Sequence, residues 1–352
     1  MKNRKTAICI IIISVIFVAL IAFSGCTGKQ AATSTAQAKK NITDMAGRNI
    51  EITSHPSKVA TIGSVPMINS LIFGMGEGDK IVNALPSSFS PARWKYQTIF
   101  APTMVGKPQL QNANRDPNIE ELLKVSPDVV FTMDKGNIEV MEKAGLPVVF
   151  LSWREPEDVK KVMQLLGDIF DKPEKAKEYI QYFDDTLKRV QTAVAGIPAE
   201  EKPKVLYCSA KTLTQPHLIV EWWTDAAGGI SVTNNGRTTE SVEFSIEQML
   251  KWDPDILILS EPKDVDIINK DERFSKVKAV VNKKVYVAPV GAHTWANRTI
   301  EQPLTILWAA KTFYPEQFKD LDIEKEMKDF YSRFFGYQLS GQEAREIISG
   351  TL

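Results

Sequence analysis

Residues 119–130 read IEELLKVSPDVV, and residues 246–257 read IEQMLKWDPDIL. The second stretch follows the first by 127 residues and keeps Ile-Glu, Leu-Lys and Pro-Asp at the same positions. Each copy predicts a short helix, a Pro that ends the helix, and a strand that begins at the Asp. A repeat of this kind indicates a duplicated structural unit.

The predicted order of strands and helices after each copy is also the same. A strand over 128–132 precedes a helix that ends at 144–145 and a strand over 148–151. A strand over 255–259 likewise precedes helical sequence and a strand over 285–288. Alternating strands and helices predict parallel sheets with right-handed crossovers. We therefore expect an α/β fold made of two duplicated lobes.

One long helix is predicted between the two lobes. Over residues 173–197 apolar side chains recur at steps of three and four, which is the period of an amphipathic helix of roughly 33 Å. Such a rigid connector leaves a ligand cleft between the lobes. Because ligands of open α/β sheets bind beyond the carboxyl ends of the strands, residues that follow the strands should line this cleft.

The N-terminus predicts export from the cytoplasm. Lys2, Arg4 and Lys5 precede an apolar run over residues 7–23, which is typical of a signal peptide. The sequence Phe23-Ser24-Gly25-Cys26 resembles a lipobox, so we expect residues 1–25 to be removed and Cys26 to be lipidated. An uncleaved membrane anchor is the alternative. Both interpretations place the folded part outside the cytoplasm. A flexible tether over 26–41 is expected to connect it to the anchor.

Composition narrows the class of protein. The 352 residues carry 43 basic and 43 acidic side chains, with 43% hydrophobic residues. These values argue against a disordered chain and a multi-span membrane protein, and the neutral balance argues against a nucleic-acid partner. With Cys26 lipidated, Cys208 has no expected disulfide partner and is interpreted as a small core residue.

These motifs together resemble the iron-complex and cobalamin type of ABC-importer substrate-binding lipoprotein. The C-terminal part of the resemblance rests on these stretches: QPLTILWAAKTFYPE at 302–316, Phe330-Tyr331 and Phe335-Gly336-Tyr337. The resemblance covers about residues 42–352 and implies two Rossmann-like lobes with parallel sheets on one long rigid helix. We predict an N-terminal lobe over 42–155, a connecting helical segment over 156–198 and a C-terminal lobe over 199–352. The resemblance also implies delivery of a ligand to a membrane permease driven by a cytoplasmic ATPase, by a protein expected to be monomeric.

The same resemblance assigns two acidic residues to permease docking. Proteins of this type dock through one acidic residue on each lobe, and the matching positions are Glu120 and Glu247. The alternative is that each Glu only complements the dipole of its helix, a contribution of about 0.3–1 kcal/mol.

The ligand site is predicted from polar, basic and aromatic residues in loops or after strands. Arginine with aromatic side chains suits a flat or chelated anion, although any single Trp more often packs in a lid or in the core. The predicted ligand-binding residues are Ser64, Arg93, Trp94, Trp153, Trp222, His293, Trp295 and Arg298, of which Arg93, Trp153, His293 and Arg298 are the foremost. Tyr96, Arg154 and Trp223 are further candidates, His217 could rim the cleft, and His55 is expected at the surface.

The predicted function is capture of an iron chelate such as a ferric siderophore. A corrinoid, a nickel chelate or an oxyanion such as molybdate would suit the same cleft. An extracytoplasmic two-lobed hydrolase or metal enzyme is the alternative from another class. The sequence contains no G-x-S-x-G, H-E-x-x-H or Walker A motif, and three scattered His residues disfavour a bare zinc or manganese site. We therefore expect neither enzymatic activity nor a resident cofactor.

Overall fold

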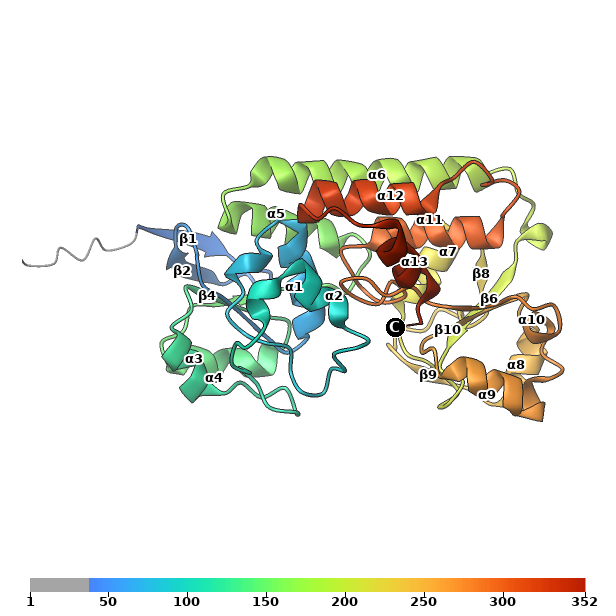
Figure 1. Ribbon diagram of the computed structural model, residues 1–352, viewed down its shortest axis with the longest axis horizontal. Helices are drawn as coiled ribbons and strands as arrows, with labels where there is room; N and C mark the ends of the chain where they lie inside the picture. Colours follow the sequence, from blue (N-terminus) through green and yellow to red (C-terminus); the bar gives the residue numbers. More distant parts are fainter. Residues whose placement is uncertain (1–37, 352) are drawn as a thin grey trace, which may run out of the picture. The chain divides into compact units, whose positions relative to one another are not determined.

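The structure is a computed structural model that describes residues 38–351. The predicted signal peptide (1–25) and the predicted lipidation site Cys26 lie outside the described residues. Within them, the elements alternate as expected for an α/β protein with parallel sheets (Figure 1). The predicted fold class is confirmed.

The first lobe is built on a parallel sheet in the order β3-β4-β5. Its strands are β3 (Val59–Ile62), β4 (Val129–Thr132) and β5 (Val148–Phe150), and all of their residues are buried. The helices of this lobe are α1 (Val65–Gly74), α2 (Lys95–Phe100), α3 (Ile119–Val125) and α4 (Ile138–Lys143). Both faces of the sheet are covered, which explains why its strands are continuously apolar instead of alternating.

Two details of the first lobe differ from the prediction. Strand β1 (Lys39–Thr43) begins inside the predicted tether over 26–41 and pairs with β2 (Asn49–Thr53), because Ile42, Ile50 and Ile52 are buried in the core. The largely apolar stretch over 81–85 predicts a further strand from its sequence, yet it contributes only a single bridge, from Ile81 to Val59. The reason is Asn83, whose side-chain oxygen accepts a hydrogen bond from the Thr61 backbone N–H at 2.9 Å in place of a strand carbonyl.

The second lobe repeats the plan with a parallel sheet in the order β11-β10-β6-β8. The strands are β6 (Lys204–Cys208), β8 (Ile230–Ser231), β10 (Ile256–Leu259) and β11 (Val285–Val287). The helices are α7 (Ile219–Ala226), α8 (Ile246–Trp252), α9 (Asp264–Lys270) and α10 (Lys278–Val281), and β7 (Thr214–Gln215) pairs with β9 (Val242–Glu243). Cys208 is buried in β6, and this burial raises the pKa of its thiol.

A helical layer joins the lobes. Helix α6 (Pro173–Val194) packs against α5 (Asp158–Ile169) and α11 (Gln302–Phe313) and runs along one side of both lobes (Figure 1). The chain closes with α12 (Ile323–Phe330), a π-helical turn over Tyr331–Phe335 and α13 (Gly341–Ser349). The predicted connecting helix is confirmed, and it ends three residues earlier than expected. None of the helices within residues 38–351 has the length and apolarity needed to cross a membrane.

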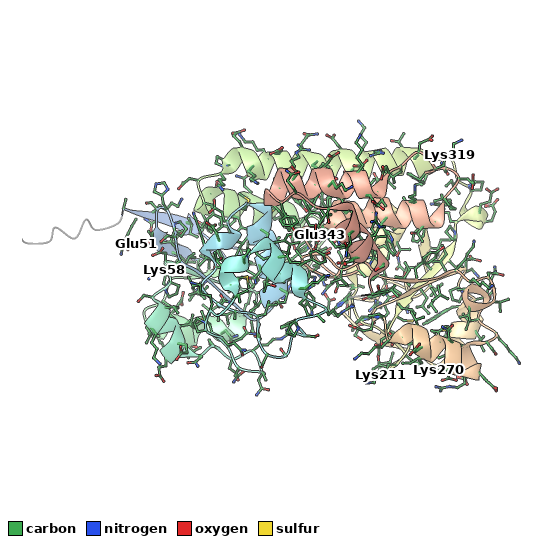
Figure 2. The ribbon with its side chains drawn as sticks, viewed as in Figure 1. Glu51, Lys58, Lys211, Lys270, Lys319 and Glu343 are labelled. Carbon is green, nitrogen blue, oxygen red and sulfur yellow. The ribbon has the colours of Figure 1, made fainter. Side chains whose placement is uncertain are left out.

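Charged side chains of both signs cover the outer surface of each lobe. Glu51 and Lys58 lie on the first lobe, and Lys211 and Lys270 lie on the second (Figure 2). All four are exposed, in keeping with the neutral composition.

Candidate ligand-binding site

A cavity with a volume of about 990 Å³ lies between the lobes. Its walls include residues that directly follow strands of both sheets: Gly63 after β3, Met133 after β4, Leu151 after β5, Ser209 after β6 and Ser260 after β10. Parallel strands bring these ends to one edge of each sheet. The cleft expected between the lobes is therefore present.

Aromatic rings form much of the cavity wall. Trp94 contacts Phe89 edge-on and lies against the His293 ring, with centroids 5.2 Å apart. His217 stacks on Tyr207 at 6.5 Å, and Trp153 also lines the cavity. Such a wall suits a ligand with flat apolar faces.

Two arginines at the cavity join the lobes and carry carboxylate partners. The Arg298 guanidinium donates to both carboxylate oxygens of Glu240, at 2.6 and 3.1 Å, and to the Arg154 backbone oxygen at 3.3 Å. Arg93 donates from Nη2 to the Ser260 backbone oxygen at 2.8 Å, and its Nε lies 3.3 Å from a Glu261 oxygen.

Three further cations face the cavity from the first lobe. Arg115, Lys135 and Arg154 line it, and none of them pairs with an acidic side chain of residues 38–351. The Lys135 ammonium lies 5.3 Å from the centre of the Phe150 ring. Asp134 is the one acid of the cavity wall that pairs with no cation of residues 38–351, so the three cations leave a positive excess, which favours an anionic ligand.

The two cavity histidines are neutral at physiological pH. Burial lowers the pKa of His293 to about 3, and the neighbouring His217 lowers it further in the same direction. Burial also lowers the pKa of His217 to about 4. As neutral imidazoles they serve as hydrogen-bonding groups and add no charge to the site.

A buried carboxylate holds the loop that carries His293 and Arg298. Glu301 is fully buried and accepts hydrogen bonds from the backbone N–H groups of Ala292 at 2.9 Å and His293 at 3.0 Å. Its other donors are the hydroxyls of Thr299, at 2.8 Å, and Tyr331. Burial raises the pKa of the Glu301 carboxyl, and these hydrogen bonds act against that rise.

The structure brings five of the eight predicted ligand residues to the cavity wall: Ser64, Trp94, Trp153, His293 and Arg298. Arg93 lies directly beside it, at Ser260 and Glu261. Trp222 and Trp295 lie elsewhere. Trp222 stacks on Phe183 of α6 at 6.0 Å, and Trp295 is fully buried beside α11, because large rings near the helical layer complete its packing.

The remaining candidates divide in the same way. Arg154 and His217 line the cavity, whereas Tyr96 and Trp223 are fully buried. His55 is exposed, as expected.

Arg115 and Lys135 were missed by the sequence reasoning. Arg115 lies in a loop closed by the bridge between Gln111 and Pro117, and its backbone has a positive φ of 70°. No periodic pattern marks a loop of this kind. Lys135 follows β4 by three residues, so the rule that ligands bind after strands could have found it.

The two predicted docking residues lie on corresponding helices of the two lobes, α3 and α8. The Glu120 side chain is 79% exposed on α3 and pairs with Lys124 at 2.7 Å. Glu247 is on α8 at a second, smaller hollow, beside Arg273 and Lys276. Within residues 38–351, no three His, Cys, Asp or Glu side chains gather closely enough to hold a metal ion.

Comparison with known proteins identifies the family. A model of the periplasmic binding protein family matches residues 76–290, more than half of the chain. A periplasmic solute binding protein from Veillonella parvula has a structure with 27% identity and a TM-score of 0.77, over 88% of this chain and 97% of that one.

Two curated relatives have names that state a cargo. The molybdate-binding protein MolA of Haemophilus influenzae is 23% identical over 86% of this chain and 92% of its own length. An iron-uptake system-binding protein of Bacillus subtilis is 24% identical over 74% of this chain and 82% of its own length. These similarities agree with the bilobal α/β fold and with the cavity between its sheets. The chain belongs to the periplasmic binding protein family.

Proposed function

We propose that this protein is the extracytoplasmic substrate-binding component of an ABC importer and that it captures an anionic metal chelate of the ferric-siderophore class. The observation that carries the proposal is the cavity of about 990 Å³, which combines an aromatic wall with three cations that have no acidic partner among residues 38–351. Cavities of this size hold drug-sized ligands, and the similarity to an iron-uptake binding protein supports iron as the metal.

The proposal includes how the protein is attached and how it delivers its ligand. Residues 1–25 are removed, Cys26 is lipidated, and the mature monomer is held at the outer face of the cell membrane. The lobes over 42–155 and 199–352, joined by the segment over 156–198, grip the ligand. The exposed Glu120 and Glu247 then dock with basic groups of the permease. The protein binds its ligand without turning it over and needs no resident cofactor.

A molybdate-type oxyanion is the second candidate. The similarity to MolA over 86% of the chain favours it. Buried N–H groups without a partner at Arg93 Nη1, Trp153 Nε1 and Arg298 Nε are donors suited to oxyanion oxygens. A small tetrahedral ion would fill only part of the cavity, which ranks this candidate second.

Ligand titration of the detergent-solubilised full chain tests the proposal. We expect ferric tris-catecholate to quench tryptophan fluorescence, because Trp94 and Trp153 line the cavity. At a hundredfold its Kd, the ligand should raise the free energy of unfolding by about 2.7 kcal/mol. Stabilisation by molybdate alone would select the second candidate. If no chelate or oxyanion stabilised the protein while some substrate was turned over, the receptor function would be wrong.

A further inference from the structure

The ion pair between Arg298 and Glu240 has unequal partners. The Arg298 side chain is only 10% exposed, whereas the Glu240 side chain is 56% exposed. The contact is forked, with two guanidinium nitrogens donating to the two oxygens of one carboxylate. This is the geometry by which arginine binds a carboxylate or a similar pair of anionic oxygens.

Glu240 reaches the cavity from a surface segment. Residues 232–241 connect β8 to β9, and most of them are exposed. The segment is tied down mainly through Arg237, which donates to the backbone oxygens of Thr239 and Glu240 and pairs with the buried Glu221. The Glu240 carboxylate accepts one further hydrogen bond, from the Leu218 N–H at 3.2 Å. Its side chain can therefore leave Arg298 while Arg237 still holds the backbone.

The same arrangement occurs at the second arginine of the cavity. The Arg93 side chain is 12% exposed and its partner Glu261 is 52% exposed. Both carboxylates belong to cavity-lining residues of the second lobe. In each pair a nearly buried guanidinium is neutralised by an acid that water can solvate after separation.

We propose that Glu240 occupies the anionic subsite of the ligand and that a bound anion replaces it on Arg298. A buried guanidinium without an anionic partner costs much free energy, so Arg298 requires an anion both before and after ligand binding. An exposed carboxylate that is released costs little free energy, because water solvates it. The inference rests on the proposed function and narrows the ligand class. The cargo presents a carboxylate or catecholate oxygen pair to Arg298, and neutral chelates gain nothing from the exchange.

The test compares Glu240→Gln with Glu243→Gln in the full, detergent-solubilised chain. Glu243 is an exposed acid on β9, directly beyond the end of the segment over 232–241, and does not line the cavity. Removing the competing charge at Glu240 should tighten binding of ferric tris-catecholate and ferric dicitrate about tenfold. Binding of a neutral ferric trihydroxamate should stay unchanged in both variants, and Glu243→Gln should match the wild type for all probes. Fluorescence titration gives each Kd.

A ligand-independent measurement separates this inference from the proposed function. Modification of Arg298 by phenylglyoxal, followed by peptide mass spectrometry, should increase several-fold in Glu240→Gln and remain at the wild-type level in Glu243→Gln. If the wild type bound no anionic probe, the proposed function would fail. The modification rates would still show whether Glu240 shields the Arg298 guanidinium. Unchanged or weaker anion binding by Glu240→Gln, with a wild type that binds, would overturn the inference alone.

Discussion

At the scale of single residues, the cavity depends on groups that do not face it. Glu301 and Tyr331 form a buried hydrogen-bonded pair behind the loop over 291–298, and this pair fixes the backbone that presents His293 and Arg298. Gly291 passes directly beside them. A Cβ at this position would overlap both the Glu301 carboxylate oxygen and the Tyr331 hydroxyl. The loop therefore requires glycine for space alone.

Gly291→Ala should destabilise the protein and weaken ligand binding. The new methyl group must displace an acceptor of two backbone N–H groups, and a disrupted hydrogen bond to a buried charged group costs about 1–3 kcal/mol. Urea unfolding measures the loss of stability, and fluorescence titration measures the affinity. Gly196→Ala is the matched control, because a Cβ there meets no atom within 4 Å. Equal stability of the two variants would show that the loop shifts freely.

At the scale of elements, the repeated Pro-Asp has the same structural role in both lobes. Asp128 accepts hydrogen bonds from the backbone N–H groups of Ser57, at 2.7 Å, and Lys58, at 2.9 Å. Asp255 accepts one from Lys204 N–H at 2.8 Å. Each Asp thus ties the start of one strand to the neighbouring strand. The preceding helices, α3 and α8, are placed alike on the two lobes and carry Glu120 and Glu247.

The double variant Glu120→Ala/Glu247→Ala should leave ligand affinity unchanged and reduce transport. Both side chains belong to the helices of the repeat and lie outside the cavity lining, so their removal should spare ligand binding and abolish only the proposed contact with the permease. Uptake of radiolabelled iron chelate by cells measures transport. The control is Glu139→Ala/Glu243→Ala. Glu139 is matched to Glu120, since both are 79% exposed and both pair with a Lys four residues later. Normal uptake by the first double variant would rule out these docking residues.

At the scale of the whole molecule, the two lobes together bury the cavity histidines, and this burial makes the stability of the folded protein sensitive to acid. His217 and His293 are kept neutral by burial, with pKa values of about 4 and about 3, while an unfolded histidine has a pKa of 6.5. Between pH 6.5 and 4 the unfolded chain therefore binds more protons than the folded protein. Stability must fall as the pH falls through this range.

The free energy of unfolding should be lower at pH 5 than at pH 7.5, by about 2 kcal/mol for each of the two histidines. Urea titrations at the two pH values measure the difference. His217→Gln and His293→Gln should each reduce it, because glutamine does not titrate. His55→Gln, at an exposed position outside the cavity, is the control substitution. A difference that survives in both cavity variants would assign the acid sensitivity to other groups.

The sequence by itself determined the fold class, the long helix and the half of the site that follows strands. These features depend on periodicity and on local signals, such as the Pro-Asp after each repeated helix and the residues just beyond β3 and β5. Ser64 and Trp153 were predictable for this reason, because the carboxyl end of a buried strand places them at the cleft.

Only the tertiary structure decided which aromatic and charged residues meet. Trp94 and Trp295 both occur in aromatic, basic loops, yet one lines the cavity and the other is buried in the helical layer. The Arg298–Glu240 pair joins residues 58 positions apart. Contacts of this kind arise from packing between distant elements, which neither composition nor periodicity encodes.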